Sequence, residues 1–185
     1  MSYESATGFK IRNQFGTHFL TFTVVGWIDL FSRQCYRQII IDNLKFCIEK
    51  KGLLVGAFVI MSNHLHFIWT ARDGNLSGVI RDFKSYTSKA IVQTIIREPE
   101  SRRSWLLHMF KYYANGTDAN DYYKIWTNDN HPEEIFSEDF LKVKLDYIHD
   151  NPIRAGIVHQ QSHYIYSSAA SYEGKQGLVD IDFLL

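Results

Sequence analysis

Two histidines separated by a single leucine are the residues of this chain best suited to chemistry. His64 and His66 lie in the apolar, strand-like stretch Val59–Trp69. Successive side chains of a β-strand point to opposite faces, so both imidazoles would project from one face and converge on one point. Imidazole binds several transition metals, and a neighbouring oxygen ligand extends the choice to Mg²⁺ or Mn²⁺. The same pair is compatible with two hydrogen-bonded structural histidines, and the pair alone does not separate these interpretations.

A phenol and an amide form a second pair of interest, close to Pro152. Tyr147 and Asn151 are four positions apart, which on a helix places both side chains on one face, one turn from each other. The structural explanation is a packing tyrosine followed by an Asn-Pro helix stop. His149 should point away from Tyr147 on the same helix, which favours a structural role for that histidine.

The elements that position these residues alternate between strands and helices. Aromatic and β-branched residues indicate the strands, and apolar residues at helical spacing indicate the helices. The predicted elements are strands at 18–25, 53–60, 64–71 and 122–126 and helices at 32–50, 76–96 and 137–149, with a loop at 114–121. This order is typical of an α+β, ferredoxin-like split βαβ sandwich, in which helices cover one face of an antiparallel sheet.

Composition limits the classes of protein to consider. The 185 residues, 45% of them hydrophobic, predict a single domain over 1–185, with a core at about 15–157 and a docked tail at 158–185. Cys35 and Cys47 form no CxxC pattern, which argues against a thiolate zinc site and fits a reducing compartment. We find no signal peptide and no apolar run of membrane-spanning length, and we therefore expect a cytoplasmic protein that does not enter a membrane.

Positive charge is concentrated locally although the formal net charge is +0. Between Arg81 and Lys111 there are seven basic residues and three acidic ones. Such a run is either a solvated helix face or a footprint for a phosphate backbone. Any nucleic-acid binding must therefore rely on local patches rather than on the overall charge.

Three motifs in order resemble a known family. They are Asn63–His66, Phe83–Tyr86 in the following helix, and Tyr147–Gly156. Together they resemble the single-tyrosine HUH transposases of the IS200-like group, most closely the REP-associated tyrosine transposases. The resemblance covers about residues 15 to 172 and implies the HUH endonuclease fold.

The resemblance also implies an activity and a set of site residues. The family consists of DNA transposases that cleave single-stranded DNA near a hairpin, such as a REP-like element, through a 5′-phosphotyrosine intermediate. Tyr147 matches the nucleophile, and the metal ligands are matched by His64, His66 and Asn151, which are expected to bind Mg²⁺ or Mn²⁺. Some insertion-sequence members act as dimers, so a homodimer is one option for the assembly.

Cationic residues that track a DNA backbone are a further expectation for such an enzyme. The candidates are Arg81, Lys84, Arg102, Arg103 and Arg154. Two alternatives stay open at this stage. One is a non-catalytic, ferredoxin-like nucleic-acid-binding protein in which His64 and His66 are core residues. The other is a metal-dependent hydrolase of small phosphoesters that uses water, with Tyr147 orienting the substrate.

Overall fold

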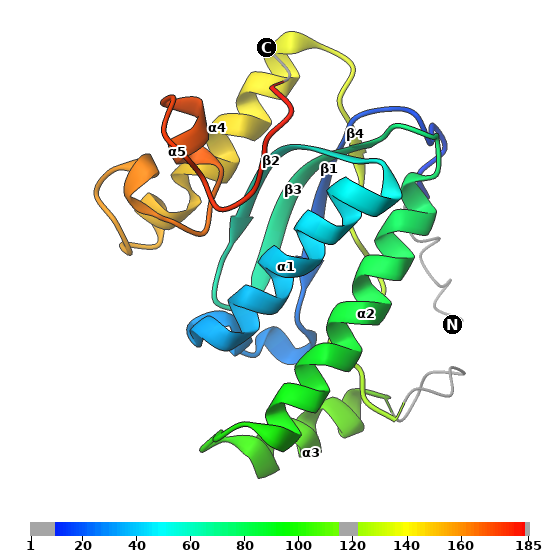
Figure 1. Ribbon diagram of the computed structural model, residues 1–185, viewed down its shortest axis with the longest axis vertical. Helices are drawn as coiled ribbons and strands as arrows, with labels where there is room; N and C mark the ends of the chain where they lie inside the picture. Colours follow the sequence, from blue (N-terminus) through cyan, green and yellow to red (C-terminus); the bar gives the residue numbers. More distant parts are fainter. Residues whose placement is uncertain (1–9, 115–121, 184–185) are drawn as a thin grey trace, which may run out of the picture.

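A four-stranded antiparallel sheet lies at the centre of the computed structural model, which describes residues 10–114 and 122–183 (Figure 1). Its strands are β1 (His18–Thr23), β2 (Leu53–Ile60), β3 (His64–Ala71) and β4 (Glu133–Glu134). The order across the sheet is β2-β3-β1-β4. Because β3 lies between β1 and β2 and runs antiparallel to both, these strands and the helix that joins β1 to β2 form a split βαβ unit.

Two helices cover one face of this sheet. In Figure 1, α1 (Gln34–Lys51) and α2 (Leu76–Arg97) lie side by side in front of the strands. Phe83 of α2 packs against the rings of Phe67 and Trp69, with centroids 5.9 and 5.2 Å away. These buried aromatic contacts form the main core, and the predicted α+β, ferredoxin-like sandwich is confirmed.

A further helix, α4 (Glu138–Arg154), lies against the opposite face of the sheet, so the helices do not all cover one face as predicted. Side chains alternate along β3, so His64 and His66 face away from α2, and the ring of Tyr147 on α4 contacts His66. The helix begins as the sequence predicts, because the Ser137 hydroxyl accepts a hydrogen bond from the Phe140 N–H at 3.2 Å.

The end of α4 differs from the prediction. We expected the helix to stop near His149, but it continues through Pro152 to Arg154. Proline removes one backbone donor, and it is tolerated here because it lies in the last turn, where the Ala155 and Ile157 N–H groups still bond to Asn151 and Pro152 carbonyls. Residues after Tyr147 therefore keep helical spacing up to Arg154.

Two elements in the region after α2 also differ from the prediction. Residues 103–114, predicted only as a basic and aromatic run, form helix α3 (Arg103–Ala114). Residues 122–126 form no strand and contribute one isolated bridge, between Val24 and Trp126. Trp126 is buried because it stacks on Phe31 and donates its indole N–H to Thr87 at 3.0 Å. The β-like pattern of residues 122–126 thus reflects aromatic packing and not strand pairing. Within the predicted loop at 114–121, positions 115–121 lie outside the described residues.

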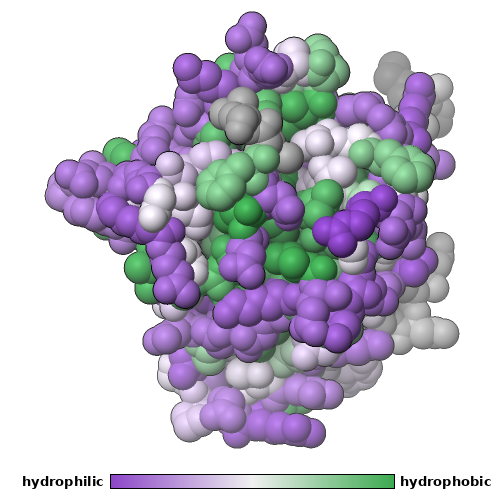
Figure 2. All heavy atoms as spheres, turned by 45° about the horizontal axis from the view of Figure 1, so that its top comes forward, coloured by the Kyte–Doolittle hydropathy of each residue, from purple (hydrophilic) through white to green (hydrophobic). Residues whose placement is uncertain are grey.

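The chain after α4 runs along the outer edge of β2. The Ile60 N–H donates to the Tyr166 carbonyl, and the Asp182 N–H donates to the Val55 carbonyl, both at 2.9 Å. A short helix, α5 (Ala169–Tyr172), interrupts this segment. The main-chain bonds cover an edge that would otherwise expose unpaired backbone groups. On the face shown in Figure 2, hydrophobic residues gather in the middle and hydrophilic residues surround them.

None of the helices in the described ranges combines the length and the apolar character that crossing a membrane requires.

Candidate active site

His64 and His66 lie next to each other on the sheet face that carries α4. Their ring centroids are 4.8 Å apart, with an angle of 72° between the ring planes. Burial lowers the pKa of His64. Burial, together with the nearby charges of His64, Arg154 and Lys144, lowers the pKa of His66 to about 3. Both imidazoles are therefore neutral near pH 7, which is the form that binds metal ions.

The amide of Asn63 selects the tautomer of His64. Nδ1 of His64 lies 2.7 Å from Oδ1 of Asn63, and an amide oxygen only accepts hydrogen bonds. Nδ1 must then carry the proton, and Nε2 keeps its lone pair. The amide is held in this orientation because its NH₂ group donates to the carbonyl of Trp27 and the carboxylate of Asp29. Metal-binding histidines are oriented in the same way by a bond from their second nitrogen.

His66 has one satisfied nitrogen and one unsatisfied nitrogen. Its Nδ1 lies 2.9 Å from the hydroxyl of Thr21, the residue directly opposite on β1. Its Nε2 is buried and has no hydrogen-bond partner among residues 10–114 and 122–183, and the residue is only 4% exposed. A buried nitrogen without a partner is costly and calls for an explanation, such as a bound ion.

The ring of Tyr147 is held directly beside His66. The two ring centroids are 5.1 Å apart in an edge-to-face arrangement, and a second edge contact reaches Phe19 at 5.8 Å. The guanidinium of Arg154, two turns along α4, lies 4.4 Å from the centroid of the tyrosine ring. Tyr147 is still 38% exposed, so it remains accessible to a substrate.

Asn151 lies on the same face of α4 as Tyr147. The continuation of the helix through Pro152 preserves the four-residue spacing between them. Asn151 is 9% exposed, which is unusual for an amide side chain. Its role as an oxygen ligand stays a prediction.

Lys144 is a residue of this site that the sequence analysis missed. Its Nζ lies 4.4 Å from the centroid of the Phe19 ring and pairs with Glu133 at 2.6 Å. Lys144 and Arg154 both contribute to the low pKa of His66, so positive charge surrounds the histidine. Helical spacing is the sequence signal that could have identified Lys144, because residues 144, 147, 151 and 154 share one face of α4. Thr21 was also missed, and only the register of β1 against β3 identifies it.

Two of the predicted DNA-binding residues, Arg81 and Lys84, lie elsewhere. They line a groove of about 950 Å³ between α2 and residues 122–132, which we call the basic groove. Its cationic residues are Lys10, Arg81, Lys84, Lys89 and Lys124. Within the described ranges no acidic side chain lines it. Burial lowers the pKa of Lys84 to about 8, and its Nζ donates to the carbonyl of Thr127 at 2.7 Å.

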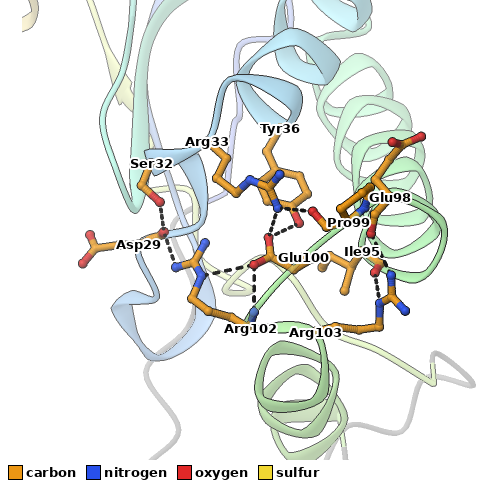
Figure 3. Close-up of polar contacts among 10 residues, drawn as sticks. All are labelled: Asp29, Ser32, Arg33, Tyr36, Ile95, Glu98, Pro99, Glu100, Arg102 and Arg103. Atoms are coloured by element: carbon orange, nitrogen blue, oxygen red, sulfur yellow. Dashed lines mark hydrogen bonds and ion pairs between the residues drawn. The ribbon is translucent and has the colours of Figure 1, made fainter.

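Arg102 and Arg103 lie at the corner between α2 and α3 (Figure 3). They belong to a set of interacting residues that we call the Glu100 cluster. The cluster consists of Arg33, Tyr36, Glu100, Arg102 and Arg103. Arg103 donates to the carbonyls of Ile95 and Glu98 at 2.9 and 2.8 Å, and thereby caps the end of α2. Of the five predicted DNA-binding residues, only Arg154 lies beside Tyr147.

We call His64, His66, Tyr147 and Asn151 the His66 site. Its predicted metal donors, two imidazoles and one amide oxygen, suit a hard or borderline divalent ion. In the part of the chain that the structure describes, no group of three or more His, Cys, Asp or Glu side chains could hold a metal. The predicted set contains two such residues, His64 and His66, and takes its third donor from the amide of Asn151. The unpaired Nε2 of His66 is the observation that favours an ion here. Two imidazoles and one amide oxygen leave coordination positions open for a substrate.

Comparisons with known proteins establish the fold. No protein-family model and no curated protein matches the sequence. Among solved structures, the chain is similar to a REP-associated tyrosine transposase bound to a REP hairpin, with a TM-score of 0.56 and 20% identity. The alignment covers 100% of this chain and 94% of that chain. The likeness shows the fold.

Proposed function

We propose that the protein is a metal-dependent single-stranded DNA endonuclease and strand transferase that forms a 5′-phosphotyrosine intermediate. The contact between Tyr147 and His66 carries this proposal. In it a partly exposed phenol lies 5.1 Å, centroid to centroid, from an imidazole whose buried Nε2 has no partner in the part of the chain that the structure describes. The similar solved structure is described as a transposase bound to a REP hairpin, which supports single-stranded DNA with a hairpin as the substrate class.

The residues His64, His66 and Asn151 would hold Mg²⁺ or Mn²⁺. When bound, such an ion withdraws charge from phosphorus and orients the scissile phosphate. Asn63 holds the imidazole of His64 and Thr21 holds that of His66, each through a hydrogen bond with the Nδ1 atom of the histidine.

Tyr147 is the proposed nucleophile. A phenol has a pKa of about 10, so it is a weak nucleophile at neutral pH unless the phosphate is activated. Its oxygen forms a bond to phosphorus while the bond from phosphorus to the 3′ oxygen breaks. The phenol proton passes to solvent, and the leaving 3′ oxygen takes up a proton. A second 3′-OH can then reverse these steps on another strand end. Lys144 and Arg154 offset the negative charge of the phosphate.

We further propose that the basic groove binds phosphates of DNA outside the reacting position. Arg81 and Lys84 line it together with three more lysines, and cationic grooves of this kind track a nucleic-acid backbone. Arg102 and Arg103 donate to the carbonyls of Asp29 and Ile95, and Lys84 likewise donates to Thr127 and Asn130. The groove is the stronger candidate because its described lining combines five cationic side chains with no acidic one.

The test is formation of a covalent adduct. The wild-type protein is incubated with single-stranded hairpin oligonucleotides and Mn²⁺, and the products are separated on a denaturing gel. We expect a protein–DNA adduct that is lost in Tyr147→Phe and on addition of EDTA. Tyr86→Phe, which alters an exposed tyrosine on α2, is the matched control and should still form the adduct.

Other results would point to the alternative functions. If the wild-type protein binds the oligonucleotides but never forms an adduct, a nucleic-acid-binding protein without cleavage activity is favoured. Release of a free 5′-phosphate product without an adduct would indicate hydrolysis by water, with Tyr147 as an orienting residue.

A further inference from the structure

Trp27 exposes its indole beside the histidines. The side chain is 67% exposed, and its ring centroid lies 6.0 Å from that of His64, with the planes tilted by 59°. Tryptophan gains more than most residues from burial. An exposed indole next to a candidate active site is therefore a feature to explain by what it could bind.

The backbone at Trp27 adopts an unfavourable conformation. Its φ is 54°, in the left-handed region, which bulky residues rarely occupy. The preceding Gly26 also has a positive φ, of 62°. The Trp27 N–H donates to the Val24 carbonyl at 3.1 Å, which helps to hold this turn. Backbone outliers of this kind concentrate at binding and catalytic sites, where the surrounding structure enforces them.

One side chain links Trp27 to the proposed metal ligand. The amide of Asn63 donates to the Trp27 carbonyl at 3.4 Å, and its oxygen accepts the Nδ1–H of His64 at 2.7 Å. The main chain adds a further bond between the same segments, because the Val24 N–H donates to the Asn63 carbonyl at 2.9 Å. The backbone of Trp27 is thus held at a set position relative to His64.

We infer that Trp27 is a nucleobase-binding platform, on which a base adjacent to the phosphate at His64 and His66 stacks. The inference rests on the proposed function, because it takes the ligand to be a single-stranded nucleic acid. Single strands present unstacked bases, and aromatic side chains bind them through their π faces. Stacking on one aromatic ring changes the affinity by about 5- to 150-fold.

The test measures binding without cleavage. Tyr147→Phe serves as the background, and its affinity for short single-stranded DNA oligonucleotides is compared with that of the same protein carrying Trp27→Ala or Trp27→Phe. Trp105→Ala is the matched control, because Trp105 is 47% exposed on α3 and makes no ring contact with either histidine. We expect Trp27→Ala to lose affinity by about 5- to 150-fold, Trp27→Phe to restore part of it, and Trp105→Ala to have no effect.

A second series locates the base. Each nucleotide of the oligonucleotide is replaced in turn by an abasic analogue. With Trp27 present, one abasic position should weaken binding strongly, and with Trp27→Ala that position should no longer matter. Such coupling between a protein change and a DNA change is what direct stacking produces.

Two results would overturn the inference. One is an unchanged affinity of Trp27→Ala for every oligonucleotide. The other is a Trp27→Ala variant whose main defect is loss of self-association in the absence of DNA, which would make the indole a contact with a second copy of the chain. Because binding alone is measured, absence of the covalent adduct in the wild-type protein would contradict the proposed function but not this platform.

Discussion

Two buried polar groups in the described part of the chain, the Glu100 carboxylate and Nε2 of His66, differ in how completely their hydrogen-bonding capacity is satisfied. In the Glu100 cluster, the carboxylate accepts hydrogen bonds from Arg33 at 2.8 Å and Tyr36 at 2.7 Å, and from the Arg102 N–H at 2.9 Å. By contrast, none of the described residues bonds to Nε2 of His66, and the neighbouring Tyr147 is partly exposed.

The pKa shifts of the two groups follow from this difference. Burial opposes the charged form of Glu100, but the hydrogen bonds from Tyr36, Arg102 and Arg33 outweigh it and lower its pKa to about 2. For His66, burial and the adjacent positive charges act in the same direction and favour the neutral imidazole. A carboxylate whose oxygens accept several hydrogen bonds stabilises the fold, whereas a buried ring nitrogen that lacks a partner among the described residues is available to a ligand.

The largest effect expected from this comparison is on activity, from His66→Ala. Loss of a ligand that supports metal-dependent chemistry should slow adduct formation by at least about 100-fold, as measured on denaturing gels with Mn²⁺. His149→Ala is the control, since its Nε2 already bonds to the Ser168 hydroxyl at 2.8 Å. This variant should lose about 1–3 kcal/mol of stability and retain activity per folded molecule. Equal activity losses in the two variants would remove the distinction between the two histidines.

The next effect is on stability, from Glu100→Ala. Removing the carboxylate leaves Arg33, Tyr36 and Arg102 without their shared acceptor, so we expect the free energy of unfolding to fall by about 3 kcal/mol. Chemical denaturation measures this change. Glu98→Ala, at an exposed position of the same connection, should change stability by less than about 0.5 kcal/mol. Adduct formation per folded molecule should not change in either variant, and a selective loss in Glu100→Ala would mean that the cluster also serves the site.

Acid should weaken the Glu100 cluster in a defined pH range. The folded-state pKa of Glu100 is about 2, below the ordinary value of 4.5. A carboxyl group whose pKa is lowered by folding contributes stability that is fully present above pH 4.5 and is lost as the pH falls toward 2. The contribution amounts to about 3 kcal/mol. Denaturation curves at several pH values give the free energy of unfolding, which should fall less on acidification in Glu100→Gln than in the wild-type protein. An identical pH dependence in the two proteins would contradict the assignment of this loss to Glu100.

A smaller effect is expected from Thr21→Val, which removes the hydroxyl bonded to His66. Outer partners of metal-binding histidines typically contribute 10- to 100-fold to metal affinity, and we expect the low end, about tenfold, because Phe19 and Tyr147 also hold the ring. Calorimetric titration with Mn²⁺ measures it. Thr23→Val, on the same face of the same strand, should leave the affinity unchanged. An equal loss in both variants would indicate a general packing effect.

Several features of the fold and the site follow from the sequence because they depend on local geometry. The two-residue period of a strand places His64 and His66 on one face. The helical period places Tyr147 and Asn151 on another, and Ser137 provides the cap that starts their helix. The order of strands and helices was enough to predict the sandwich, which the described structure and its structural neighbour bear out.

Other features depend on contacts between residues far apart in the chain, and local periodicity does not encode them. The register of β1 against β3 brings Thr21 to His66. Packing of α4 on the sheet brings Tyr147 to His66, although the two residues are 81 positions apart in the sequence. The sequence by itself thus determined two half-sites, each through its own backbone period. Only the tertiary structure decided that they meet, because long-range packing and strand register set that distance.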